Sequence, residues 1–333
     1  MLESQLKSEE TLKRSNESKM YRTHCTHCLR LKAKNGSILM IELMVSGGLG
    51  NQMFEYAAAR CIQIERKEKM ALNTYLYRRD KAGRGFSLDH FKLNDDICVY
   101  DKPRVIIRFL GLIGNIRFKG KLRDVDSIFA LTIGRLINAH IWRSRSFKPI
   151  RKNSNIIYGY FQSEKYFSTI EPQLKEELRV KEETTGNNQE IIEDILVNES
   201  VCIHIRRGDY IKENLVVCTL DYYHAAIDYM KRKLHTCKFF VFSDDIEWVK
   251  DNLDLPQAVF ITEDNKDYQE LELMYHCKHF IISNSSFSWW AQYLSNNENK
   301  IVIAPDKWMP DEESRDPVFM DNWIIVSQNG VIL

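Results

Sequence analysis

The second half of this chain alternates short apolar runs with helical patterns, and no other feature constrains the fold as strongly. Apolar runs of strand length lie at 200–205, 238–242, 259–261, 279–283 and 300–304, and helices are predicted at 221–234, 246–253, 268–277 and 288–295. Strands that alternate with helices in this way form parallel sheets with the helices on their faces. The second half is therefore predicted to be a Rossmann-like domain, with 300–304 as its last strand.

The folded part of the first half begins with the same pattern. An apolar run at 37–45 predicts a buried strand, 47–50 form a glycine turn, and 51–69 carry apolar residues at helical spacing. Strand, glycine turn and helix open a Rossmann-like unit. A polar, turn-rich stretch at 181–190 is the best candidate for a linker. The 333 residues are thus predicted to form two domains, 40–190 and 191–333, after a flexible extension of residues 1–39.

The net charge is small but unevenly distributed. The chain has 47 basic and 46 acidic side chains, which argues against a general nucleic-acid-binding protein. Residues 101–152 hold 13 basic and 3 acidic side chains, whereas 153–333 hold 17 and 31. The basic segment has two interpretations: a solvated helical face, which we favour, or a surface that contacts anionic lipid or a lipid-linked glycan acceptor.

The cellular location is predicted from the absence of apolar segments long enough for a membrane helix or a signal peptide. No apolar stretch reaches the 18 or more residues of a spanning helix, and the N-terminus has no apolar signal core. We expect a cytoplasmic protein, with peripheral contact at the inner face of the membrane as an open alternative. The eight cysteines are widely spread and are expected to be reduced. Residues 24–28 include zinc-like ligand types, but five consecutive residues cannot easily wrap one ion, so no metal site is predicted.

Two motifs provide positive charge or backbone N–H groups at predicted strand ends. Gly47-Gly-Leu-Gly50 lets backbone N–H groups approach a phosphate, or it is a plain tight turn. It is not the G-x-G-x-x-G pattern, which disfavours a nicotinamide oxidoreductase. Arg206 and Arg207 directly follow a buried strand. Partial burial of a guanidinium group costs free energy unless an anion pairs with it. Either both bind phosphate, or one makes a salt bridge with Asp209 that orders the turn.

Two further motifs follow other predicted strands. Asp244 and Asp245 could hold a divalent metal, accept N–H groups of a guanine-type base, or cap the next helix, and capping is the simplest of these. The run 283–290 offers hydroxyl and N–H groups that suit a phosphate, although serines are also common helix caps. Its paired tryptophans, Trp289 and Trp290, are interpreted as core residues.

These motifs together resemble the bacterial α-1,2-fucosyltransferases, glycosyltransferase family 11. The resemblance covers residues 40–310 and rests on Gly48-Leu-Gly-Asn-Gln-Met-Phe-Glu-Tyr-Ala57, Gly159-Tyr-Phe-Gln-Ser-Glu-Lys-Tyr-Phe167, His204-Ile-Arg-Arg-Gly-Asp-Tyr210, Phe242-Ser-Asp-Asp245 and Asn284-Ser-Ser-Phe-Ser-Trp-Trp290. The His-x-Arg-Arg-x-Asp element is also similar to protein O-fucosyltransferases and α-1,6-fucosyltransferases. The Asn-Ser-Ser-Phe-Ser-Trp-Trp run narrows the resemblance to the α-1,2 group.

The resemblance implies an α/β, GT-B-like fold of two Rossmann-like domains with a ligand cleft between them. It also implies GDP-L-fucose as donor, a terminal β-galactoside as acceptor, inversion at the sugar carbon and no metal or other cofactor. The enzyme would be a galactoside α-1,2-fucosyltransferase. The alternatives are a fucosyltransferase of other linkage or acceptor, and a noncatalytic nucleotide- or glycan-binding module on the same fold.

Site residues follow from the matched motifs. Arg206 is expected to stabilise charge on the leaving phosphate, and Arg207 to order the loop beside the donor. The other expected donor-binding residues are His204, Asp244 and Asp245 near the guanine, Asn284, Ser285 and Ser286 near the phosphates, and Gly48, Gly50 and Asn51 from the first domain. The base for the acceptor hydroxyl is left open among Asp209, Glu213 and Glu55.

Overall fold

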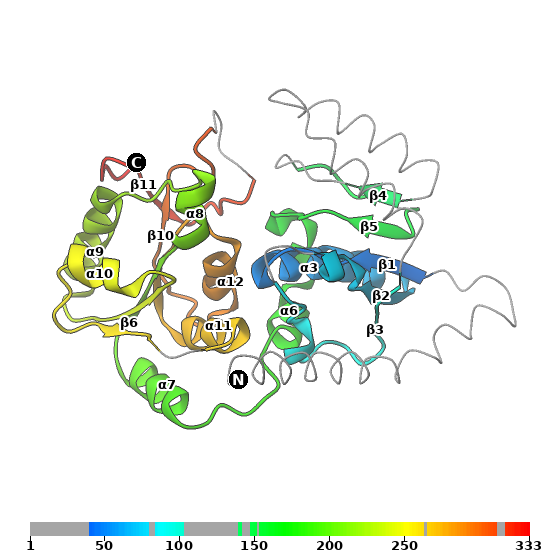
Figure 1. The fold of residues 1–333 in the computed structure, drawn as a ribbon, viewed down its shortest axis with the longest axis horizontal. Coiled ribbons are helices and arrows are strands. Elements are labelled where there is room, and N and C mark those ends of the chain that lie inside the picture. The colour runs from blue at the N-terminus through cyan, green and yellow to red at the C-terminus, as the bar shows by residue number, and fades with distance from the viewer. Residues whose placement is uncertain are drawn as a thin grey trace, which may run out of the picture.

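The computed structural model describes residues 40–79, 84–102, 139–141, 147–151, 153–262, 265–311 and 317–333 (Figure 1). The predicted extension 1–39, the zinc-like motif within it and most of the basic segment 101–152 lie outside the described residues.

The first domain is built on a five-stranded parallel sheet. Its order is β3-β2-β1-β5-β4, with the strands β1 (Met40–Met44), β2 (Lys69–Asn73), β3 (Cys98–Tyr100), β4 (Ala139–Ile141) and β5 (Ile156–Tyr158). The long helix α3 (Leu49–Arg66) follows β1 and buries the apolar side predicted from its spacing. It ends three residues earlier than predicted, at the left-handed C-cap Lys67, whose N–H donates to the carbonyl oxygens of Gln63 and Ile64. β2 then begins at Lys69, inside the segment predicted as helix.

The second domain is built on a six-stranded sheet, also parallel throughout. Its order is β11-β10-β9-β6-β7-β8, with the strands β6 (Ser200–Ile205), β7 (Lys238–Ser243), β8 (Val259–Phe260), β9 (His279–Ile281), β10 (Val302–Pro305) and β11 (Ile324–Val326). The predicted parallel sheet is confirmed. The prediction that the sheet ends with 300–304 is wrong, because β11 pairs with β10 and adds one more strand. The apolar run 323–326 is no shorter than the predicted strand at 259–261, so the sequence contained this signal and the prediction overlooked it.

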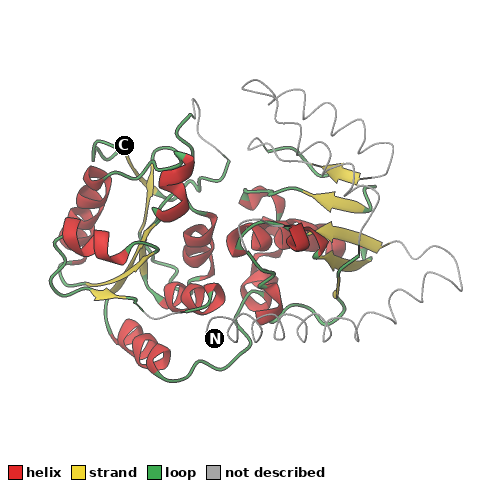
Figure 2. Ribbon diagram, in the orientation of Figure 1, coloured by secondary structure: helices red, strands yellow, loops and turns green. Residues whose placement is uncertain are grey.

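Helices cover both faces of the second sheet (Figures 1 and 2). Helices α11 (Asp267–His276) and α12 (Ser286–Leu294) lie on the face toward the first domain, and α9 (Leu220–Leu234) and α10 (Ile246–Asn252) lie on the other. Alternate residues of each strand enter the two layers: Cys202 and Phe240 pack with the first pair of helices, and Val201 and Val241 with the second. This is the period-two pattern of a strand buried on both faces.

Shorter elements complete the two domains. They are η2 (Tyr75–Arg79), η3 (Leu88–His90), η4 (Glu164–Tyr166), η5 (Ser168–Ile170), α6 (Glu171–Glu177), α7 (Asn187–Val197) and α8 (Gly208–Glu213). Helix α7 starts inside the predicted linker 181–190 and packs against α11 of the second domain. The extended connection therefore ends at Gly186, which has a positive φ of 64°.

The two domains share a packed aromatic interface. The ring of Phe54, on α3, lies 4.6 Å from that of Trp289 and 5.1 Å from that of Trp290, both on α12. Phe167 stacks on Trp290 with ring centroids 5.5 Å apart. All four side chains are fully buried or nearly so, so the tryptophan pair is core, as predicted. The fold is the expected GT-B-like pair of Rossmann-like domains, joined by this interface.

The sequence also predicts reduced cysteines and no membrane-spanning helix. Among the described residues Cys61, Cys202, Cys218, Cys237 and Cys277 are free thiols. In the described part of the chain, no helix has the length and hydropathy needed to cross a bilayer.

Candidate functional site

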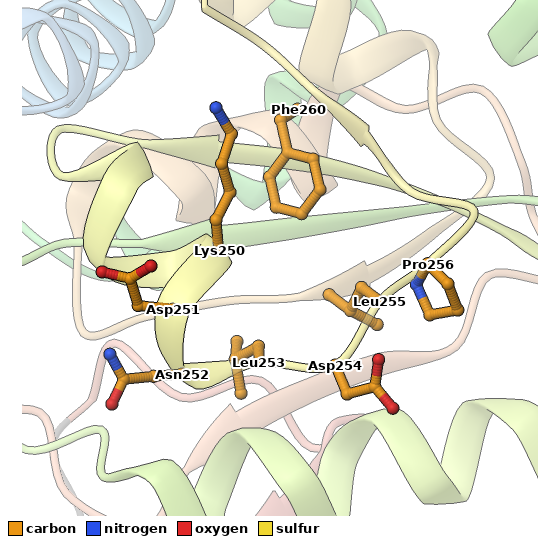
Figure 3. A pocket seen from close by; sticks show the side chains of 8 residues that line it. All are labelled: Lys250, Asp251, Asn252, Leu253, Asp254, Leu255, Pro256 and Phe260. Atoms are coloured by element: carbon orange, nitrogen blue, oxygen red, sulfur yellow. The ribbon is translucent and has the colours of Figure 1, made fainter.

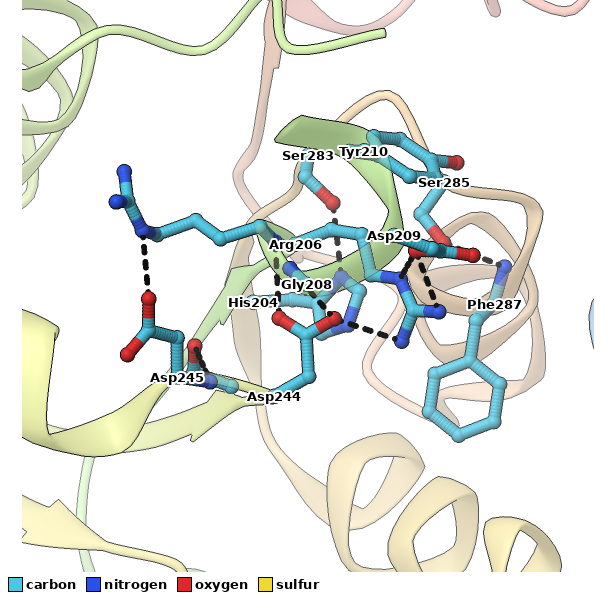
Figure 4. Close-up of polar contacts among 12 residues, drawn as sticks. His204, Arg206, Gly208, Asp209, Tyr210, Asp244, Asp245, Ser283, Ser285 and Phe287 are labelled. Carbon is cyan, nitrogen blue, oxygen red and sulfur yellow. Dashed lines mark hydrogen bonds and ion pairs between the residues drawn. The ribbon is translucent and has the colours of Figure 1, made fainter. Parts of the chain in front are cut away.

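Polar residues from three strand ends meet at the carboxyl edge of the second sheet. β9, β6 and β7 are neighbours in the sheet, so the segments that follow them come together. These segments carry the Ser283–Ser286 run, the Arg206–Arg207 pair and the Asp244–Asp245 pair. Open α/β sheets bind ligands at this edge. The three motifs that sequence placed at separate strand ends thus form one cluster (Figure 4).

Arg206 lies at the centre of this cluster and is held by two carboxylates. Its Nε and Nη2 lie 3.0 Å and 2.8 Å from Oδ1 of Asp209, and its Nη1 lies 3.1 Å from Oδ2 of Asp244. Its guanidinium carbon lies 5.7 Å from the ring centroid of Tyr210. The side chain is still 36% exposed, so its charge is available to a ligand.

Asp244 fixes the turn that carries the arginines. Its two carboxylate oxygens accept hydrogen bonds from the backbone N–H groups of Arg207, at 2.8 Å, and of Gly208, at 3.1 Å. A Cβ on Gly208 would lie 2.8 Å from the Asp244 carboxylate, so glycine allows this close approach. The helix-capping interpretation of the aspartate pair is wrong: Asp245 is the N-cap of α10 but makes no side-chain cap bond. Instead, its N–H donates to Oγ of Ser243.

Arg207 takes a different direction from Arg206. Its Nε lies 3.1 Å from Oδ2 of Asp245, and its guanidinium carbon lies 3.5 Å from the ring centroid of Trp248. Both partners belong to α10 and its N-cap, on the face of the sheet away from the first domain. These contacts suit the expected loop-ordering role of Arg207, because a stacked and paired guanidinium stabilises the turn.

His204 is buried beneath the arginines. Its Nδ1 lies 2.9 Å from Oγ of Ser283, and its ring centroid lies 5.8 Å from that of Phe287. Burial, and secondarily the nearby charge of Arg206, lower the pKa of His204 to about 3. The imidazole is therefore neutral at physiological pH and can bind a ligand as a hydrogen-bonding group but not as a cation.

The serine run both caps a helix and shapes the edge of the site. Oγ of Ser285 accepts a hydrogen bond from the N–H of Phe287 and caps α12, as the simpler interpretation predicted. Nδ2 of Asn284 donates to the carbonyl oxygens of Leu215 and Trp308 and so anchors two loops. Ser286 begins α12 and is partly exposed. Its hydroxyl is the group of this run best placed to meet an anion at the helix N-terminus.

The first domain brings the N-terminus of α3 against that of α12. A Cβ built on Gly50 would lie 2.5 Å from the carbonyl carbon of Ser286 and 2.6 Å from the backbone nitrogen of Phe287. Gly50 therefore allows the two helices to touch backbone to backbone. Asn51, one residue on, accepts a hydrogen bond from Nε2 of Gln162 at 2.7 Å. Gln162 belongs to the quoted motif 159–167, but sequence analysis gave it no role at the site.

The three candidate bases lie in different surroundings. Glu55 is fully buried, and its two oxygens accept hydrogen bonds from the N–H and the hydroxyl of Ser46, at 2.8 and 2.9 Å. It supports the turn after β1 and is not placed to receive a proton from a bound acceptor. Glu213 is exposed at the end of α8, and Asp209 is half-exposed beside Arg206. The geometry leaves Asp209 and Glu213 as the accessible candidates.

Glu270 is a titratable residue of the site that sequence analysis missed. It lies on α11, in the electrostatic field of Arg206 and Asp244. Burial, assisted by Asp244 and Asp267 and opposed by Arg206, raises the pKa of Glu270 to about 7. The sequence contained a signal for this residue. Glu270 and the buried Met274 are four residues apart and therefore lie on the same face of α11, so a carboxylate at position 270 faces the protein interior.

Comparison with known proteins identifies the family. The sequence profile described as glycosyl transferase family 11 matches residues 138–327, which is more than half of the chain. The chain belongs to glycosyl transferase family 11. The matched region includes all three strand-end motifs of the second domain, and the sequence resemblance is thereby confirmed.

Three curated relatives of this family 11 chain each match more than four fifths of its length. The alpha-1,2-colitosyltransferase of Escherichia coli is 30% identical over 87% of this chain and 99% of its own. The O-antigen biosynthesis glycosyltransferase WbnK of Escherichia coli is 28% identical over 84% of this chain and 98% of its own. The galactoside 2-alpha-L-fucosyltransferase of Caenorhabditis elegans is 30% identical over 88% of this chain and 81% of its own.

Metal-ligating side chains and a surface depression also bear on where this family 11 chain binds its ligand. Within the described residues, no three His, Cys, Asp or Glu side chains gather closely enough to hold a metal ion. A depression of about 410 Å³ lies beside the C-terminal end of α10 and is lined by Lys250, Asp251, Asn252, Leu253, Asp254, Leu255, Pro256 and Phe260 (Figure 3). None of the predicted site residues lines it, so the strand-end cluster, and not this depression, is the candidate active site.

Proposed function

We propose that this family 11 protein transfers L-fucose from GDP-L-fucose to the 2-hydroxyl of a terminal β-galactoside, with inversion to an α-1,2 linkage. The observation that carries the proposal is Arg206, a half-buried cation at the carboxyl edge of a parallel sheet, near the N-termini of α3 and α12. A nucleoside diphosphate needs this combination of guanidinium and helix N-termini. The α-1,2 linkage is supported by the names of two relatives, an alpha-1,2-colitosyltransferase and a galactoside 2-alpha-L-fucosyltransferase.

In the proposed mechanism, fucose leaves GDP through an oxocarbenium-like transition state. Negative charge develops on the β-phosphate, and Arg206 stabilises it at the moment it forms. Positioned charge of this kind is commonly the largest catalytic contribution, on the order of 3–4 kcal/mol for one donor. Residues 191–333 form the proposed donor-binding domain and residues 40–190 the acceptor-side domain, with Gly48, Gly50 and Asn51 closing the site.

The remaining site residues have proposed roles that fit their surroundings. His204 binds the donor as a neutral hydrogen-bonding group, and Ser285 and Ser286 face the phosphates at the start of α12. The acceptor hydroxyl loses its proton to Asp209 or Glu213, and a dissociative reaction needs only a weak base. We propose no metal and no other cofactor, because Arg206 and the helix N-termini beside it supply the positive charge that stabilises the leaving diphosphate.

The test is a coupled assay of GDP release. GDP-L-fucose is supplied with lactose, N-acetyllactosamine or a β-1,3-linked galactoside, and the linkage of any product is determined by NMR. A fucosyltransferase releases GDP faster when its galactoside is added, whereas a noncatalytic binding module does not. Binding of GDP without acceptor-dependent release, across all galactosides, would contradict the proposal and favour the module.

Colitosyl transfer is a second candidate, favoured by the 30% identity to an alpha-1,2-colitosyltransferase. Colitose is L-fucose without its 3-hydroxyl, so the same diphosphate site serves either donor. The two candidates separate when GDP-L-fucose and GDP-colitose compete in one reaction. A higher kcat/KM for GDP-colitose would assign the chain to colitosyl transfer and leave the rest of the mechanism intact.

The proposed location is the cytoplasm, with peripheral contact of residues 101–152 at an anionic membrane as the accompanying hypothesis. The 13 basic side chains of this segment would attract such a surface. Co-sedimentation with liposomes tests the contact. Binding that does not depend on anionic lipid or on salt would remove the electrostatic hypothesis.

A further inference from the structure

The ion pair of Arg206 with Asp209 uses the edge of the guanidinium that also suits a phosphate. Nε and Nη2 form the fork by which arginine binds a carboxylate or phosphate with two parallel N–H bonds. In this structure both nitrogens contact Oδ1 of Asp209, at 3.0 and 2.8 Å. Asp209 therefore lies where a diphosphate oxygen would bind Arg206.

The two carboxylates around Arg206 are held very differently. Asp244 accepts two backbone hydrogen bonds, from Arg207 and Gly208, and is 24% exposed. Asp209 is 49% exposed, and within the described residues the hydrogen bonds of its side chain go to Arg206 alone. Asp244 cannot leave without breaking the turn, whereas Asp209 needs only a side-chain rotation.

A bound diphosphate would be the third anionic group around one guanidinium. Like charges in contact are strongly unfavourable, and the fixed position of Asp244 leaves Asp209 as the group that can move. We propose that Asp209 is an exchangeable partner of Arg206, displaced from the Nε–Nη2 edge when the donor diphosphate binds and restored when GDP leaves. This inference rests on the proposed function, because it takes a nucleoside diphosphate as the ligand of Arg206.

The exchange has a consequence for affinity. Each molecule of GDP must compete with Asp209 for Arg206, so the carboxylate weakens diphosphate binding and speeds product release. Removal of the carboxylate should therefore tighten binding. A carboxylate that merely orients Arg206 gives the opposite sign, because its loss would leave the arginine mobile and weaken binding.

The experiment measures the Kd of GDP, pyrophosphate and guanosine by calorimetry at low salt, for the wild-type chain and for Asp209→Asn. An exposed ion pair is a weak interaction, so we expect GDP and pyrophosphate to bind about 2- to 5-fold more tightly to the variant. The Kd of guanosine, which has no phosphate, should stay unchanged. Weaker or unaltered binding of GDP and pyrophosphate, or tighter binding of guanosine, would overturn the exchange.

Two controls keep the result interpretable. Glu247→Gln removes one negative charge from the same domain at an exposed side chain that pairs with Lys250, and it should not change the Kd of GDP. Asp209→Ala repeats the test if the asparagine variant does not fold. If the wild-type chain binds GDP and neither Asp209 variant binds GDP more tightly, the exchange is refuted but the proposed function is not. A wild-type chain that does not bind GDP refutes the proposed function, and the exchange with it.

Discussion

Gly50 offers a sharp test of the contact between the domains. Replacement by alanine places a Cβ 2.5–2.7 Å from three backbone atoms of Ser286 and Phe287. Carbon atoms in contact normally lie about 3.5–4.0 Å apart, so α3 and α12 must separate by about 1 Å. Backbone atoms cannot rotate away from the new Cβ as a flexible side chain can. The displacement therefore separates the packed residues of the interface between the two domains.

The energetic cost follows from the packing around this contact. Phe54 lies one turn further along α3 and packs on Trp289 and Trp290, and a radial gap of about 0.5–1 Å forfeits a quarter to a half of each dispersion contact. Overpacking costs about 1–3 kcal/mol, while alanine in place of a helical glycine gains about 0.5–1 kcal/mol. The net loss therefore lies between about 0 and 2.5 kcal/mol, and its midpoint of about 1 kcal/mol lowers Tm by roughly 2–4 °C.

Thermal unfolding and donor kinetics measure the effect together. Gly50→Ala should lower Tm and raise the KM for the donor, because the separation moves the N-terminus of α3 away from Arg206. Gly85→Ala is the matched control, since a Cβ at Gly85 meets nothing within 4 Å. A Gly50→Ala chain with the Tm and KM of the wild type, or with a higher Tm, would refute the backbone contact.

Three other predictions test the site. Arg206→Ala should lower kcat about 10²- to 10³-fold at saturating donor, whereas Arg207→Ala should chiefly lower Tm; near-normal turnover of the Arg206 variant would remove it from the mechanism. The folded-state pKa of Glu270 is raised from 4.5 to about 7, so its contribution to stability is complete below about pH 4.5 and is lost as pH rises through 7. Glu270→Gln should therefore have a flatter Tm profile than the wild type between pH 5 and 8 and the higher Tm at pH 8, and parallel profiles would refute the shift. Glu55→Gln should lower Tm through the loss of one charged hydrogen bond to Ser46, with kcat reduced only several-fold; a folded variant with kcat reduced about 10³-fold would restore Glu55 as the base.

Sequence alone was sufficient to predict that the second domain is built on a parallel sheet with helices between its strands. Period-two apolar runs and the helical spacing between them are local properties, and the carboxyl ends of parallel strands share one edge. Arg206, Asp244 and Ser285 could therefore be assigned to one site before their positions were known. The end of α3 was less predictable, because the helix stops at the left-handed cap Lys67. The short strand β11 was overlooked, although its apolar run is as long as the one predicted at 259–261.

The tertiary structure decided what each polar side chain does. The residues alone left open which arginine binds an anion, and only the family resemblance gave the phosphate to Arg206 and the loop to Arg207. In the structure Arg206 lies beside Asp209 and Arg207 lies over Trp248. Glu55 carried the right chemistry for a base, and only the fold shows that Ser46 occupies it. The reason is physical: hydrogen-bond partners, burial and charge come from residues distant in sequence. The amino-acid pattern determines which strand ends meet, and packing determines which side chains remain free to act.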